Sequence, residues 1–144
     1  PLRAEEVMER GRARHPYRLM GLIAVAGGLA LSTAAWAQAP WVAPPAERAR
    51  KNPQPADATT FALGEKMAKA NCTPCHGARF TGNGPAATAL TPKPADWTSP
   101  RVQGQTDGEL FWKISNGRGA MPPWKHLGDK ERWALIRFIR SLKK

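Results

Sequence analysis

Five consecutive residues, Cys-Thr-Pro-Cys-His at positions 72–76, constrain this chain more than any other part of its sequence. Two thiols separated by two residues can each form a thioether with one vinyl edge of a porphyrin. The imidazole of the next residue, His76, can then ligate the iron. This spacing is the attachment pattern of a c-type haem. Because the haem is bound through Cys72 and Cys75, it becomes part of the folded core, and the pattern predicts a fold built around one haem c.

A Cys-x-x-Cys pair also occurs in thioredoxin-like redox sites and as half of a zinc site. The redox site is typical of a βαβ setting, which this sequence does not predict, and zinc needs two further ligands. The sequence has no third cysteine, and its other histidines are His15 and His126. These observations favour haem attachment.

Residues 1–37 have the features of an N-terminal targeting segment. Arginine-rich sequence precedes an apolar centre at residues 22–31, which has the length of a signal-peptide core. Residues 35–37 read Ala-Trp-Ala, a cleavage pattern, so we expect a mature chain that starts at Gln38. The alternative is an uncleaved membrane anchor, because the charge-free run continues to Ala46. Either form carries the cysteines across the membrane, which predicts a periplasmic or otherwise extracytoplasmic protein.

Two further parts follow. Residues 38–56 contain five prolines, which predicts an extended, poorly packed linker. Residues 57–144 then form the only folded domain. A domain of this size buries a modest core, and a haem would supply the missing apolar mass.

Positive charge dominates beyond residue 37, with 17 Lys and Arg residues against 8 Asp and Glu. Such a surplus suits an anionic partner, namely an acidic protein surface or an anionic membrane. Export makes nucleic acid the least suitable of the anionic partners. A membrane partner is expected only if the N-terminal segment is retained.

The first of three predicted helices spans residues 58–71, with Asp57 or Thr59 as its N-cap. Residues 77–105 are rich in proline and glycine, which indicates an ordered loop with one short helix near residues 85–90. No alternating strand pattern occurs in the sequence. The predicted fold class is therefore all-α.

The second predicted helix begins at a capping box formed by Thr106 and Glu109 and ends at Gly117. The third spans residues 129–142 and has an apolar stripe of helical periodicity. The stripe consists of Trp133, Leu135, Ile136, Phe138, Ile139 and Leu142.

Met121 is the strongest candidate for the second axial ligand of the iron. It lies in a loop of glycines and prolines just after the second helix, and the prolines would stiffen that loop. A thioether is a soft, neutral ligand that favours ferrous iron. Met121 could instead fill a gap in the core, and His126 is the alternative ligand. Met67 is too close to the motif in sequence to reach the opposite face of the haem.

These features together resemble a small, exported, monohaem bacterial cytochrome c with His/Met ligation. The resemblance covers residues 57–142. It rests on the haem motif with Gly77, the Gly82-Asn83-Gly84-Pro85 turn, the Gly119-Ala120-Met121-Pro122 loop and the aromatic terminal helix. It implies that the first and last helices cross beside the haem. Gly64 would lie at the crossing, under Leu135 and Phe138, whereas Ala68 stands where the family usually has an aromatic residue.

The same resemblance implies further site residues. It makes the backbone carbonyl of Pro85 the acceptor of a hydrogen bond from His76, which would fix the imidazole. It places Trp97 and Trp112 in the haem pocket or beside its propionates. Packing in the core is the alternative for both tryptophans.

The predicted function is one-electron transfer between respiratory or other redox complexes, either as a free carrier or as a bound subunit of an oxidase or dehydrogenase. An iron with both His76 and Met121 bound has no open site, so we expect no catalytic residues and no enzyme activity. A haem-based gas sensor or a peroxidase-like domain with a labile Met121 is the main alternative. A thiol–disulfide oxidoreductase without haem is the other.

Docking to an acidic redox partner is expected at the exposed haem edge. Arg79, Arg118 and Lys125 are predicted to lie near its rim. Four other basic residues lie on the predicted last helix: Lys130, Arg132, Arg137 and Arg140. In the alternative interpretation, all these charges form a solvated face that serves only solubility.

Overall fold

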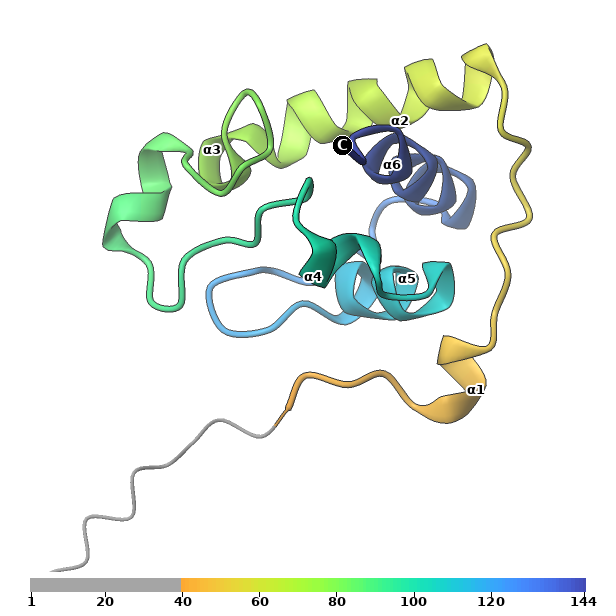
Figure 1. The fold of residues 1–144 in the computed structure, drawn as a ribbon, viewed down its shortest axis with the longest axis horizontal. Helices are drawn as coiled ribbons and strands as arrows, with labels where there is room; N and C mark the ends of the chain where they lie inside the picture. The colour runs from red at the N-terminus through yellow and green to blue at the C-terminus, as the bar shows by residue number, and fades with distance from the viewer. Residues whose placement is uncertain (1–39) are drawn as a thin grey trace, which may run out of the picture. The chain divides into compact units, whose positions relative to one another are not determined.

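The computed structural model describes residues 40–144 (Figure 1). Its helices are, in chain order, α1 (Pro45–Arg48), α2 (Ala58–Asn71), α3 (Thr73–His76), the 3₁₀ helix η1 (Pro85–Ala89), α4 (Pro100–Gln103), α5 (Asp107–Asn116) and α6 (Asp129–Ser141). No strand occurs in this part of the chain. The all-α prediction is confirmed, and α1, α3 and α4 are short helices that the sequence did not predict.

The predicted caps set the ends of the main helices. Asp57 caps α2 by accepting a hydrogen bond from the backbone N–H of Thr60 at 2.7 Å. Thr106 caps α5 in the same way, with the N–H of Glu109 at 3.1 Å. The second hydrogen bond of a capping box, from the backbone N–H of Thr106 to the Glu109 carboxylate, is absent. That carboxylate pairs instead with Lys113 at 3.0 Å.

Helices α2 and α6 cross at close range (Figure 1). A Cβ added at Gly64 would overlap the carbonyl of Ala134 and lie 2.9 Å from the Cβ of Phe138. The predictions for Gly64 and Phe138 are therefore confirmed. Ala134 provides the nearest backbone at the crossing, four residues before Phe138 and on the same face of α6. Leu135 lines the cavity described below.

The apolar core lies between α2, α5 and α6 and includes two groups of aromatic rings. Phe111 stacks on Trp133 with 4.1 Å between ring centroids. Phe80 meets Phe138 edge-on at 5.3 Å. Ala68 is completely buried, so the small residue that replaces the family's usual aromatic is accommodated by close packing.

Residues 40–56, here called the N-terminal strap, differ from the prediction. Figure 1 shows this segment running along the outside of α5 and α6 before it enters α2. Ala43 is 1% exposed. The side chain of Asn52 donates to the carbonyl of Trp133 at 3.0 Å. The prediction of a poorly packed segment is therefore wrong, because its polar groups have partners in the domain.

None of the helices within residues 40–144 is both long and apolar enough to span a bilayer. The predicted targeting segment and its cleavage pattern, residues 1–37, lie outside the described residues.

Candidate functional site

The Cys-x-x-Cys-His motif lies where α2 passes into α3. The carbonyl of Cys72 accepts hydrogen bonds from the backbone N–H of Cys75 at 3.2 Å and from that of His76 at 2.8 Å. These bonds make one further helical turn, in which residues three and four apart share a face. All three residues consequently line the same cavity.

A backbone carbonyl holds the imidazole of His76 from behind. The Nδ1 atom lies 2.9 Å from the carbonyl oxygen of Ala95. Since a carbonyl only accepts, Nδ1 carries the proton and Nε2 keeps a lone pair that can ligate a metal. Burial lowers the pKa of His76, and the bond to Ala95 offsets part of this effect. The environment therefore favours the neutral imidazole, which is the form that ligates iron.

The acceptor of this hydrogen bond is not the predicted one. Pro85 is exposed, begins η1 and does not line the cavity. The chain instead returns through a second proline-containing stretch, residues 91–95, which brings Ala95 behind the imidazole. The prediction for Pro85 is wrong because η1 and this stretch lengthen the loop beyond the turn that the resemblance had used.

The two cysteines are half-buried and are not joined by a disulfide. Burial, reinforced by the neighbouring Cys75, raises the pKa of the Cys72 thiol to about 12. Cys72 therefore stays protonated near neutral pH, whereas thiol–disulfide exchange requires a thiolate. This environment disfavours the thiol oxidoreductase interpretation.

The loop between α5 and α6 brings Met121 to the same cavity. Gly117 opens the loop with a φ of +61°, which glycine adopts without strain. The N–H of Arg118 donates to the carbonyl of Met121 at 2.8 Å, and the N–H of Met121 donates back at 3.0 Å. Beyond this turn, the N–H of Trp124 donates to the carbonyl of Ile114 at 3.0 Å and ties the loop to α5.

Of the two candidate ligands on this loop, only Met121 lines the cavity. Met121 is half-buried and packs against the apolar core. His126 is exposed, with its ring 5.2 Å from that of Trp124. The structure thus brings Met121, and not His126, together with the motif.

The cavity has a volume of 440 Å³ and mostly apolar walls. This volume is within the range of about 300–1,000 Å³ that is usual for small-molecule and cofactor sites. Trp97 forms part of the wall, stacks on Phe80 at 4.7 Å and lies 4.8 Å from the ring of His76. Trp112 is not among the residues that line it. Two thiols, an imidazole nitrogen and a thioether on an apolar cavity are a donor set that fits a haem c.

Sequence reasoning missed part of the cavity wall. Pro40 and Trp41 come from the N-terminal strap, Leu135 from α6, and residues 91–95 from the loop behind His76. The prolines of residues 91–95 were a signal that this loop is rigid. Nothing in the sequence marks Trp41, because its segment has neither helical nor strand periodicity.

Comparison with known proteins decides between the interpretations of the motif. Residues 59–139 match the family described as cytochrome c oxidase, cbb3-type, subunit III. The chain belongs to this family. It is a small c-type cytochrome, with the all-α cytochrome c fold and a covalently bound haem, and it is a haem-based electron carrier. No match was found among curated proteins.

Two solved structures are similar to this cytochrome. One is the Kuenenia stuttgartiensis reducing HAO-like protein complex Kustc0457/Kustc0458, with a TM-score of 0.57 and 28% identity over 64% of this chain and 47% of the other. The cytochrome therefore spans about half the length of that matched chain. The other is the KustC0563 c-type cytochrome, with 26% identity, a TM-score of 0.48 and coverage of 56% of this chain and 98% of that one.

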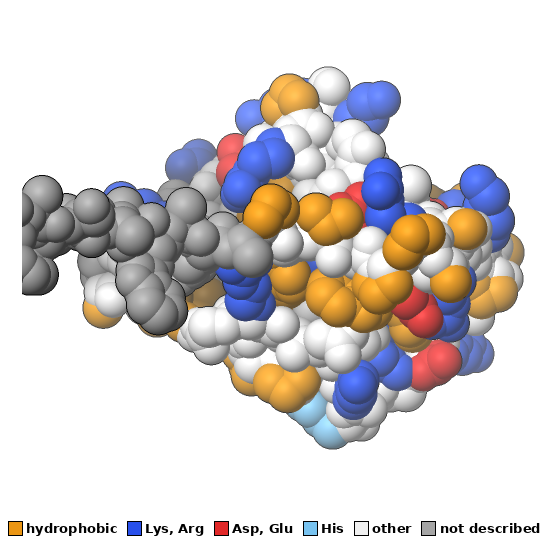
Figure 2. All heavy atoms as spheres, turned by 90° about the horizontal axis from the view of Figure 1, so that it is seen from below, with side chains coloured by type: hydrophobic (Ala, Val, Ile, Leu, Met, Phe, Trp, Pro, Cys, Tyr) orange, Lys and Arg blue, Asp and Glu red, His pale blue; other side chains and the backbone are white. Residues whose placement is uncertain are grey.

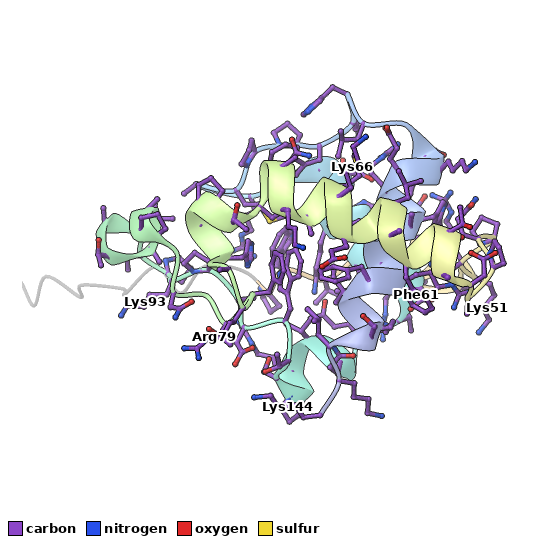
Figure 3. The ribbon with its side chains drawn as sticks, turned by 90° about the horizontal axis from the view of Figure 1, so that it is seen from above. Lys51, Phe61, Lys66, Arg79, Lys93 and Lys144 are labelled. Carbon is purple, nitrogen blue, oxygen red and sulfur yellow. The ribbon has the colours of Figure 1, made fainter. Side chains whose placement is uncertain are left out.

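Three basic residues line the cavity, whereas Arg79 and Lys125, also predicted for its rim, are not among the lining residues. Arg118 lines it, as predicted for the rim, and so do Lys93 and Arg101. Figure 3 shows Arg79 and Lys93 on the same side of the domain, both pointing outward. Lys125, which follows Met121 in the same loop, is exposed. The face in Figure 2 has apolar side chains along its middle, with Lys and Arg side chains and a smaller number of Asp and Glu side chains among and around them.

The basic residues of α6 have a different role from the one predicted. Arg132 is only 6% exposed. Arg137 and Arg140 are half-buried and donate to backbone carbonyls of other segments, at 2.7 Å and 2.9 Å respectively. Lys130 alone among the four is exposed. The interpretation of all these charges as a solvated face is wrong for the three arginines.

Proposed function

We propose that this cytochrome is an exported one-electron carrier in which His76 and Met121 ligate the haem iron and Cys72 and Cys75 form its thioethers. A c-type haem supplies one-electron redox chemistry at its iron. The protein residues hold and orient the haem, exclude water from it and select the ligands. No residue of this chain is assigned a catalytic role, and we propose that it is not an enzyme.

The observation that carries this proposal is that His76 and Met121 line one cavity from separate segments of the chain. His76 is fixed by a helical turn and by the carbonyl of Ala95, with Nε2 left to bind iron. Met121 is fixed by the turn that it forms with Arg118. Two strong-field ligands would leave the iron no position for oxygen, peroxide or another substrate.

Visible spectroscopy of the purified, haem-loaded protein tests this function. The carrier predicts a low-spin reduced spectrum that carbon monoxide does not change. Rapid binding of carbon monoxide by the unmodified protein would support the gas sensor or peroxidase-like alternative, in which Met121 dissociates readily.

The partners of this carrier are redox proteins. The description of its family supports a place beside, or as a bound subunit of, a membrane-bound respiratory complex. The basic rim formed by Lys93, Arg101 and Arg118 favours acidic docking surfaces on these partners. Nucleic acid is not proposed as a partner.

We place the protein in the periplasm or another extracytoplasmic compartment, with residues 1–37 as its targeting segment and residues 38–144, which include the N-terminal strap, as the cytochrome domain. N-terminal sequencing of protein from native soluble and membrane fractions tests this proposal. A mature chain that starts near Gln38 supports cleavage, and an intact hydrophobic segment in the membrane fraction supports an anchor.

A further inference from the structure

The N-terminal strap is fixed to the domain near the start of α5. The hydroxyl of Thr106 donates to the carbonyl of Arg48 at 2.8 Å. Gly108 is buried, and a Cβ added there would overlap the carbonyl oxygen of Glu47 and lie 2.9 Å from that of Arg50. The strap backbone can therefore pass this close to α5 only because residue 108 has no side chain.

A second set of contacts fixes the strap to the core and to α6. The guanidinium of Arg50 lies 4.5 Å from the centre of the Phe111 ring, a favourable cation–π geometry. Further along, Arg137 donates two hydrogen bonds to the carbonyl of Gln54, at 2.9 Å and 2.7 Å. Because these partners are more than fifty residues from the strap in sequence, they hold it in one place on the folded domain.

The other end of the strap reaches the cavity. Pro40 and Trp41 both line it, and Ala43, two residues further on, is buried. The Trp41 ring has the ammonium of Lys113 at 5.6 Å from its centre. That ammonium is itself held by Glu109 at 3.0 Å. The indole is thus positioned both by its own segment and by a side chain of α5.

We infer that the strap is a built part of the haem site, and that Trp41 is the residue with which it covers one side of the cavity. An indole at the wall replaces water there. Water stabilises the more highly charged, oxidised form of the haem, so excluding it raises the reduction potential. The inference rests on the bound haem and on the cavity wall, and it does not depend on which residue is the sixth ligand.

The test measures the midpoint potential of the haem-loaded protein by spectroelectrochemical titration in four variants. Trp41→Ala opens the wall, and Trp41→Phe restores an aromatic ring. Gly108→Ala replaces no residue that lines the cavity, but its Cβ pushes the strap, and Trp41 with it, away from α5, although alanine by itself favours a helix. Gly128→Ala is the matched control, because a Cβ there would have only Glu131 in ordinary contact at 3.5 Å.

We expect the potential to shift downward in Trp41→Ala, to return toward the parent value in Trp41→Phe, to shift downward in Gly108→Ala and to stay unchanged in Gly128→Ala. Limited proteolysis should cut the strap faster in Gly108→Ala than in the control. An unshifted potential in Trp41→Ala overturns the assignment of Trp41.

A shift in Trp41→Ala with none in Gly108→Ala, despite faster proteolysis, overturns the role given to the strap. Absorption spectra of each variant separate these outcomes from a failure of the proposed function. If Met121 did not ligate the iron, the parent protein itself would lack the low-spin spectrum. The inference about the strap instead predicts that the variants differ in potential while their spectra stay the same as that of the parent protein.

Discussion

The two sides of the haem cavity are built in different ways. His76 is 9% exposed, follows directly from α2 and has a second contact to the carbonyl of Ala95. Met121 is half-buried and lies on a loop whose shape depends on two glycines with positive φ and a pair of backbone hydrogen bonds. A ligand on a helix shares the stability of the whole α2–α6 crossing. A ligand on a loop depends on a few local bonds, so the methionine side is the one expected to open first.

Replacing the two cysteines tests the side of the cavity that carries His76, and it has the largest expected effect. Cys72→Ala with Cys75→Ala should abolish haem that survives acid–acetone extraction. Loss of the cofactor should also unfold the domain, because little other apolar mass fills the cavity. Extraction and circular dichroism measure both effects. The Cys72→Ala variant, with one thioether left, is the control. Covalent haem in the double variant would refute the assignment.

Opening the loop side should leave the haem attached. Met121→Ala should free the sixth position, lower the reduction potential and allow carbon monoxide to bind. His126→Ala should leave the spectrum and the potential unchanged, because His126 is exposed outside the cavity. Carbon monoxide titration of both variants measures this difference. If His126→Ala opens the iron and Met121→Ala does not, the ligand is His126 and the comparison of the two sides fails.

A smaller change should loosen the loop without removing the ligand. Both Gly117 and Gly119 have positive φ, so alanine at either costs roughly 1–2 kcal/mol of backbone strain. A Cβ at Gly117 would also overlap the carbonyl oxygen of Met121 and lie 2.5 Å from Pro122, whereas nothing lies within 4 Å at Gly119. Gly117→Ala should therefore raise the fraction of protein that binds carbon monoxide, and Gly119→Ala should change it much less. Equal effects would show that strain alone, and not the contact with Met121, controls the loop.

The smallest expected effect concerns the charges beside the loop. Reversing Arg118 and Lys125 to Glu should slow electron transfer to an acidic partner more than reversing Lys66 and Lys130. Both control lysines are exposed and neither lines the cavity, whereas Arg137 is unsuitable because it holds the strap. Stopped-flow rates across a range of ionic strength measure the difference. Equal slowing by both pairs would mean that net charge matters and this rim does not.

Local features of the sequence were enough to predict much of this structure. The bounds of α2, α5 and α6 followed from caps and apolar periodicity, and the Cys-x-x-Cys-His motif marked the haem side of the cavity. Met121 was predicted to face the haem from its neighbours in the sequence alone, and it does line the cavity. These features were readable because each depends on residues only a few positions apart.

Other features depend on contacts between distant segments, and only the tertiary structure decided them. The hydrogen bond of His76 goes to Ala95 and not to Pro85, because the path of the intervening loop selects the carbonyl that reaches Nδ1. The proline content of the N-terminal strap indicated an extended backbone, which it largely has, but proline content cannot tell a free tether from a docked segment. Apart from Asn52, the hydrogen-bond donors that fix the strap belong to the N-cap of α5 and to α6, and folding alone brings them to it.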